Sequence, residues 1–135
     1  MSWNRNIPET EISEQITPKT VSFAKDFGEY LAKKEDLNEE PLTTSQLRRF
    51  FGEVKRQQLN GYNEAEFIML KPKLAYAVGR AKKDQRKTYK IGDFFEVMSA
   101  AIDTVVKSPD KEKAFKNFIN VFEAIVAYHK AAEGK

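Results

Sequence analysis

The 135-residue sequence contains no cysteine and only one histidine, His129. Without cysteine the chain can form no disulfide and no thiolate zinc site, and it has no thiol nucleophile. A single histidine cannot supply a metal site built on two imidazoles. His129 also falls on the apolar stripe of a predicted helix, where a structural role is favoured over a chemical one.

Other signatures of catalysis and of membrane insertion are also absent. The sequence has no Walker loop, no Gly-x-Gly-x-x-Gly pattern and no acidic metal cluster. Asp93 and Glu96 share a predicted helix face, but such acid pairs are common and no further ligands lie near them. The sequence therefore predicts a protein that is not an enzyme and has no cofactor or metal. No apolar run approaches about 18 residues and no signal peptide is evident, which predicts a cytoplasmic protein.

The apolar residues that are present predict a folded helical domain. Hydrophobic residues make up 41% of the sequence, with ten phenylalanines and five tyrosines, as is typical of a packed core. Their spacing follows the helical period, without a competing strand alternation. We therefore predict an all-α fold, a compact bundle of about five helices in one domain over residues 18–135. Residues 1–17 are polar and predict an extended or mobile arm, with Trp3 and Ile7 as candidate anchors.

The first two predicted helices have clear start and stop signals. Pro18 can open the first helix, which ends near residue 34 before an acidic loop at residues 35–41. Thr43 and Gln46 match a capping box, the strongest helix-start signal in the chain. The helix that they begin ends near Asn60-Gly61, a common C-terminal stop.

The remaining helices are bounded less sharply. Asn63 can cap a third helix, in which Pro72 either causes a kink or marks the meeting of a short helix with a second one. A fourth helix is predicted over residues 91–106. Ser108-Pro109 ends it, and either Ser108 or Asp110 can cap the last helix.

The net charge of +3 is concentrated in the middle of the chain. Residues 1–42 carry a net charge of −4, residues 43–90 carry +8 and residues 91–135 carry −1. Within residues 71–90, eight bases accompany a single acid, Asp84. Ordinary solvated helices usually mix acids with their bases, so this concentration favours a surface for a polyanion over a bland solvated face.

The helical period places much of this charge beside the predicted core face. A helix that continued through the basic segment would align Lys73, Tyr76, Arg80, Lys83 and Lys87 in one stripe. An aromatic ring in such a stripe can stack on a base, although a lone tyrosine is more often a packing residue. The helix before it adds two pairs of bases seven residues apart. Together these positions give the candidate nucleic-acid-binding residues Arg48, Arg49, Lys55, Arg56, Lys71, Lys73, Tyr76, Arg80, Lys83, Arg86 and Lys87.

Three segments, in order, resemble a known family. Residues 43–55 resemble its helix "TTSQ-x-R-x-FF", residues 70–80 resemble its "LKPKLAY" segment followed by an arginine, and residues 118–130 resemble its closing helix, which ends in Tyr-His-Lys. The family is the small subunit of the Csm complex, the type III-A CRISPR–Cas RNA-guided interference machine. The resemblance extends from about Thr43 to Lys135, and the first forty residues contribute little to it.

The resemblance implies an all-helical, non-catalytic subunit of an antiviral defence complex, present in several copies. Such subunits stack beside the Cas7-type backbone subunits, in a complex that also holds a Cas10-type large subunit, and line the channel where guide (crRNA) and target RNA pair. RNA cleavage belongs to the backbone subunits and DNase activity to the large subunit. The resemblance supports six of the candidates, Arg48, Arg49, Lys55, Lys71, Lys73 and Arg80, whereas the others depend on the charge pattern.

A protein–protein adaptor remains the alternative function. Its basic middle third would dock on an acidic surface of a partner subunit, without direct RNA contact. A neighbouring copy offers one such surface in its acidic first third. A stand-alone DNA-binding protein is disfavoured because no helix-turn-helix spacing is evident.

Overall fold

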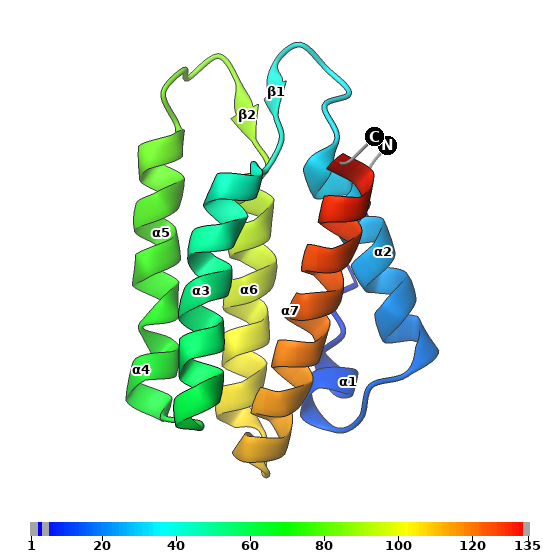
Figure 1. Ribbon diagram of the computed structural model, residues 1–135, viewed down its shortest axis with the longest axis vertical. Helices are drawn as coiled ribbons and strands as arrows, with labels where there is room; N and C mark the ends of the chain where they lie inside the picture. Colours follow the sequence, from blue (N-terminus) through cyan, green and yellow to red (C-terminus); the bar gives the residue numbers. More distant parts are fainter. Residues whose placement is uncertain (1–2, 4–5, 134–135) are drawn as a thin grey trace.

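The computed structural model describes residue 3 and residues 6–133, and these fold as a bundle of helices (Figure 1). Five helices of 12 residues or more confirm the predicted all-α bundle, and two helices of five residues accompany them. The elements are α1 (Glu9–Ser13), α2 (Pro18–Ala32), β1 (Glu39–Glu40), α3 (Thr44–Asn60), α4 (Glu64–Ile68), α5 (Leu70–Ala81), β2 (Thr88–Tyr89), α6 (Ile91–Lys107) and α7 (Lys111–Glu133).

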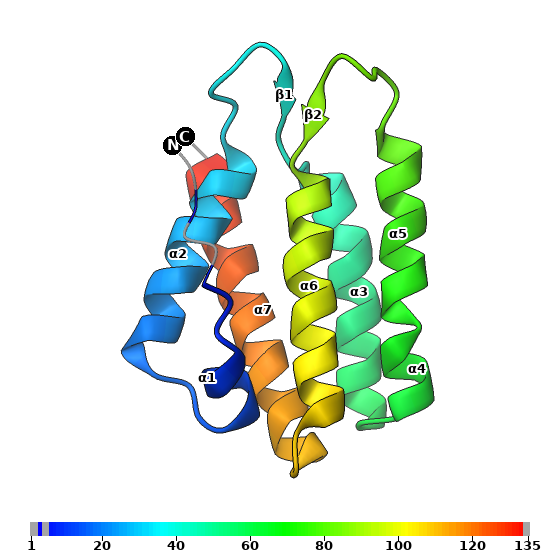
Figure 2. The same cartoon turned by 180° about the vertical axis from the view of Figure 1, so that it is seen from behind.

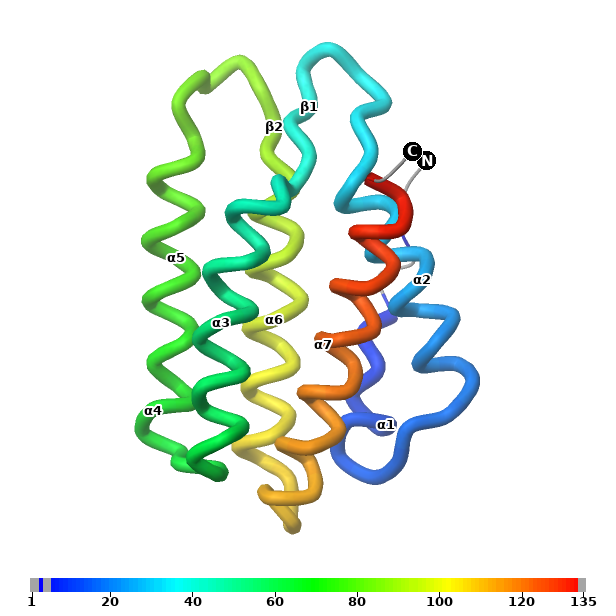
Figure 3. The backbone as a smooth tube through the Cα atoms, viewed as in Figure 1, coloured from blue at the N-terminus to red at the C-terminus, as the bar shows by residue number. Residues whose placement is uncertain are grey.

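The long helices run side by side and alternate in direction along the chain. In Figure 1, α2, α5 and α7 ascend while α3 and α6 descend. Helices α3 and α7 lie toward the viewer, and the view from behind in Figure 2 brings α6 to the front. The backbone tube in Figure 3 shows α1 at the lower end of the bundle, where it contacts α6 and α7.

The predicted caps explain where the helices begin and end. The backbone N–H of Gln46 donates to Thr43 Oγ1 at 3.1 Å, and that of Thr43 donates to Gln46 Oε1 at 2.9 Å, which confirms the capping box. Helix α3 ends at Asn60 and is followed by the C-cap Gly61, whose φ of 87° suits glycine. The last helix is capped by Asp110, whose Oδ1 accepts from the N–H of Lys113 at 3.1 Å.

The segment around Pro72 forms two helices rather than one kinked helix. Asn63 Oδ1 accepts from the N–H of Glu66 at 3.0 Å and starts α4, as predicted. The two helices meet at Met69, and Pro72 is the third residue of α5. Proline is tolerated in a first turn because the N–H groups there have no intrahelical acceptor.

The core is densest where α2 crosses α7, because both helices present small or apolar residues there. A Cβ added to Gly28 would lie 2.7 Å from the carbonyl oxygen of Ile125 and 2.9 Å from Cβ of Tyr128. Only glycine permits this separation of the two backbones. Between α3, α6 and α7, the rings of Phe50, Phe94 and Phe122 pack edge-to-face or tilted.

The segment before α2 packs on the bundle, unlike the extended arm that its polarity suggested. Residues 9–13 form α1, in which Ile12 is fully buried. The Trp3 ring lies 4.6 Å from that of Phe27 in α2, measured between centroids. Trp3 and Ile7 thus anchor the segment as expected, whereas a helix as short as α1 carries no periodic signal in the sequence.

Two short strands join distant loops at the upper end of the bundle. Strands β1 and β2 pair in parallel, with Glu39 opposite Thr88 and Glu40 opposite Tyr89. The sequence predicted only a loop at residues 35–41, because two-residue strands carry no periodic signal. None of the helices in the described part of the chain has the length and hydrophobicity needed to cross a membrane.

Candidate nucleic-acid interface

A groove of about 730 Å³ runs between α3 and α5 and gathers the main candidates from both helices. Helix α5 packs mainly on α6 and α3 mainly on α7, so their facing sides are left to line the groove. Its apolar lining includes Phe50, Leu70, Leu74 and Ala77. Its polar and charged lining includes Glu40, Arg49, Glu53, Lys73, Tyr76, Arg80 and Lys83. We call this feature the α3–α5 groove.

The upper part of the α3–α5 groove carries cations without carboxylate partners. Among the described residues, no ion pair involves Arg49, Arg80 or Lys83. The Arg80 guanidinium instead lies over the Tyr76 ring, 5.7 Å from its centroid. The Tyr76 side chain is 69% exposed, so the ring stands in solvent beside these cations. This part of the groove therefore carries net positive charge.

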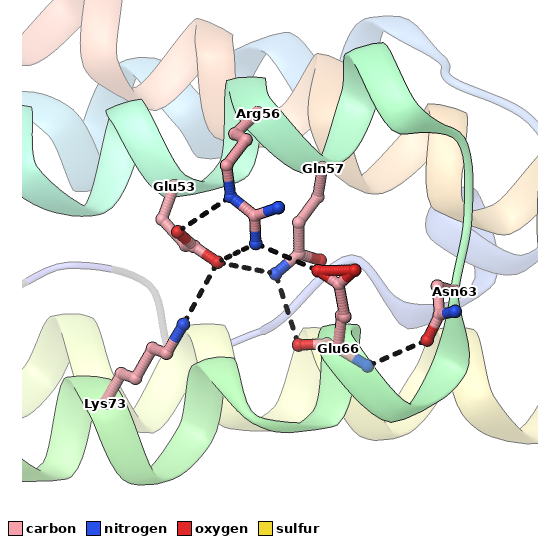
Figure 4. Close-up of polar contacts among 6 residues, drawn as sticks. All are labelled: Glu53, Arg56, Gln57, Asn63, Glu66 and Lys73. Atoms are coloured by element: carbon pink, nitrogen blue, oxygen red, sulfur yellow. Dashed lines mark hydrogen bonds and ion pairs between the residues drawn. The ribbon is translucent and has the colours of Figure 1, made fainter.

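The lower part of the groove is neutralised by Glu53 (Figure 4). Its carboxylate accepts from Arg56 Nη2 at 2.7 Å, from Lys73 Nζ at 3.1 Å and from Gln57 Nε2 at 3.1 Å. The hydrogen bond from Arg56 is the main reason that the pKa of Glu53 falls to about 2, with Gln57 and Lys73 adding to it. Two of the predicted phosphate-binding side chains thus already hold an anion.

A second acid extends this network toward α4. Arg56 Nη2 also donates to Glu66 Oε2 at 2.9 Å. The buried Gln57 amide donates to the Glu66 carbonyl oxygen at 3.2 Å, which fixes the turn between α3 and α4 (Figure 4). Both hydrogen bonds tie α3 to α4, and Arg56 pairs with an acid of each helix, Glu53 of α3 and Glu66 of α4.

Two further candidates face α7 rather than the groove. Lys55 Nζ pairs with Glu123 of α7 at 2.6 Å and lies 5.8 Å from the centroid of the Phe51 ring. Lys130 of α7 approaches the same ring at 5.9 Å. Arg48 lies seven residues before Lys55 and so shares its helix face. The two pairs of bases predicted on α3 therefore belong to different surfaces.

The remaining candidates are held by acids from other elements. Lys71 pairs with Asp103 of α6 at 2.8 Å. Lys87 Nζ pairs with Glu40 of β1 at 2.6 Å, and this hydrogen bond lowers the pKa of Glu40 and raises that of Lys87. Arg86 pairs with Asp84 at 3.1 Å. All three bases are thus paired with carboxylates, and none of them lines the α3–α5 groove.

The predicted stripe was wrong at Lys87, because α5 ends at Ala81. Residues that follow the helix no longer keep the 100° step on which the face calculation relied. Lys83 still lines the α3–α5 groove, but Lys87 turns to β1. The stripe therefore reduces to Lys73, Tyr76, Arg80 and Lys83.

Lys90, the last base of the segment, is a structural residue. Its side chain is 2% exposed, and Nζ donates to the carbonyl oxygens of Tyr30 and Lys33 at 2.7 Å each. These carbonyls lie at the C-terminal end of α2, where a cation also opposes the negative end of the helix dipole. The ammonium lies 4.0 Å from the centroid of the Tyr30 ring and 3.7 Å from Glu39. Local sequence gave no signal of this burial.

His129 has the structural position that its stripe predicted. The residue is fully buried, and ring Nε2 lies 2.6 Å from the carbonyl oxygen of Leu42. A carbonyl only accepts, so Nε2 carries the proton and donates. The Leu42 N–H in turn donates to Leu31 O at 2.8 Å, so this pair of hydrogen bonds joins α7, the loop before α3 and the end of α2. In residue 3 and residues 6–133, no cluster of three or more His, Asp or Glu residues could hold a metal ion.

These features define a class of small all-helical protein with a cationic surface groove. The sequence profile of the family described as Csm2 Type III-A matches residues 14–135. The chain therefore belongs to the Csm small-subunit family of type III-A CRISPR–Cas systems, a structural family whose members are part of the Csm complex. No curated protein and no solved structure matches the chain.

Proposed function

We propose that this chain is a non-catalytic small subunit that contacts guide and target RNA in the cytoplasm through the α3–α5 groove. Its other faces would pack on identical copies and on the Cas7-type and Cas10-type subunits of the complex. The observation that carries the proposal is the group of Arg49, Arg80 and Lys83, three cations that no carboxylate of the described residues neutralises. Cations that have no internal partner can neutralise phosphates without first breaking an ion pair.

The other candidates fit this role less well because phosphate would have to displace a carboxylate. Lys73 and Arg56 are held by Glu53, and Lys87 is held by Glu40. Contacts made by the free cations would be largely independent of sequence, since phosphates carry no base identity. The proposed subunit is therefore a positioning element for RNA rather than a reader of its sequence.

Charge reversal tests the proposal in the assembled complex. We expect Arg49→Glu, Arg80→Glu and Lys83→Glu together to weaken target-RNA binding by about 10- to 100-fold and to reduce the salt slope by about 2–3. The matched control reverses three exposed lysines at the other end of the bundle, Lys107, Lys113 and Lys116, and changes the net charge equally.

Filter-binding titrations at several salt concentrations measure both quantities, and circular dichroism checks that the variants keep their helices. Equal binding by both triple variants would refute the assignment to the groove. The adaptor alternative makes a different prediction, because its basic surface meets protein. Ultraviolet crosslinking that yields no RNA-linked peptide from residues 48–56 or 71–87 would favour the adaptor.

A further inference from the structure

The α3–α5 groove presents more apolar surface than phosphate contact requires. Phe50, Leu70 and Leu74 form its buried floor, and its accessible hydrocarbon belongs to Tyr76, Ala77 and Ala81. Phosphate oxygens gain nothing from such a surface. We propose that the groove receives one unpaired nucleotide of the bound RNA, with its base against Tyr76. This inference builds on the proposed function and names the part of the RNA that the groove would hold.

The position of Tyr76 is the first argument for a base. It is the one aromatic among the large hydrophobic residues that are strongly exposed in the described part of the chain, at 69%. The ring lines the groove beside Arg80, whose guanidinium covers one side at 5.7 Å. A tyrosine next to an arginine is a stacking platform for bases, because each offers a flat surface to a π-system.

The size of the groove is the second argument. A volume of about 730 Å³ lies in the range of about 300–1,000 Å³ that is usual for small-molecule sites. That space suits a single nucleotide and is too small for a base pair with both of its backbones. Duplex RNA would therefore cross the rim, and only an unpaired residue could enter.

The distribution of charge is the third argument. Arg49, Arg80 and Lys83 lie on the groove together with the ring, so a phosphate beside a stacked base would meet a cation. In the lower part of the groove Glu53 already pairs with Lys73 and Arg56, so a phosphate there would have to displace its carboxylate. Stacking on Tyr76 is open to every base because each has a π-face, so we expect little preference among the four bases.

The test uses target RNAs that carry one bulged 2-aminopurine, placed at successive positions along the guide–target duplex. Bound to the assembled complex, at least one position should show fluorescence quenching, because stacking on an aromatic ring quenches this base. Tyr76→Leu should remove the quenching and weaken binding of that bulged target by about 5- to 100-fold more than it weakens binding of the fully paired target. Tyr76→Phe keeps the ring and should keep both properties.

Two results would overturn the inference. One is quenching and affinity that are the same in the Tyr76→Leu complex as in the original. The other is obtained by placing a photo-crosslinking phenylalanine analogue in place of Tyr76. Crosslinking to a neighbouring subunit instead of RNA would show that the groove holds protein. These results can be distinguished from failure of the proposed function, because reversal of Arg49, Arg80 and Lys83 should weaken the binding of paired and bulged targets alike.

Discussion

Glu53 offers the sharpest test of how the charged residues of this protein stabilise its fold. Its carboxylate accepts hydrogen bonds from Arg56, Gln57 and Lys73, and so joins α3 to α5 (Figure 4). Glu53→Gln removes the negative charge and keeps one carbonyl oxygen as an acceptor. We expect the variant to fold and to be less stable than the original protein at neutral pH.

The pKa of Glu53 sets the size of the effect. A carboxyl whose pKa falls from 4.5 to about 2 contributes at most about 3 kcal/mol of stability at neutral pH. The side chains of Arg56 and Lys73 are 47% and 55% exposed, so solvent screening reduces this to about 1–2 kcal/mol. Because the folded pKa is the lower one, the contribution is complete above about pH 5 and is lost as the pH falls toward 2.

Urea unfolding followed by circular dichroism, at pH 7 and at steps down to pH 3, measures the difference between the two proteins. The original should be about 1–2 kcal/mol more stable at pH 7, and the gap should narrow with each step below pH 5. Glu123→Gln is the matched control, since its partner Lys55 forms a half-exposed pair worth about 0–1 kcal/mol. A gap that is the same at pH 7 and pH 3 would refute the electrostatic explanation.

Two further predictions concern the packing of α2. Gly28→Ala should lower stability by about 1–3 kcal/mol because its Cβ would meet the Ile125 carbonyl. The control Gly52→Ala, whose Cβ would have nothing within 4 Å, should raise stability by about 1 kcal/mol. Equal melting temperatures of the two variants would contradict this. Lys90→Met keeps the stem but removes two buried hydrogen bonds, so it should cost about 2–3 kcal/mol in urea unfolding. The exposed control Lys82→Met should change stability by less than about 0.5 kcal/mol, and a similar loss in both would show that Lys90 is not a cap.

The parts of the fold that could be predicted are those fixed by neighbours in sequence. The capping box of Thr43 and Gln46 and the stop at Gly61 each depend on residues within one turn, and each lies where the sequence placed it. The helical period also separated buried from exposed faces along α6 and α7. His129 was assigned to the core on the same ground.

The partners of the charged side chains could not be predicted in this way. Lys71 and Asp103 are 32 residues apart, and Lys87 and Glu40 are 47 apart, so only the folded chain brings them together. The end of α5 at Ala81 also lacked a glycine or proline signal, and the stripe was drawn too long as a result. The position of a lysine or arginine in a basic segment therefore does not show whether a carboxylate already pairs with it.

The ion pairs change what the basic segment means for RNA binding. Six of the candidates already have carboxylate partners: Lys55, Arg56, Lys71, Lys73, Arg86 and Lys87. A phosphate that approached one of them would have to compete with that carboxylate, and Glu53, with its pKa of about 2, is a strong competitor. Counterions are released from RNA when its phosphates are neutralised by cations that were not already paired. The paired residues therefore add less to RNA affinity than their number suggests. The RNA-binding surface that we propose is therefore smaller than the charged segment and consists of the unpaired cations beside Tyr76.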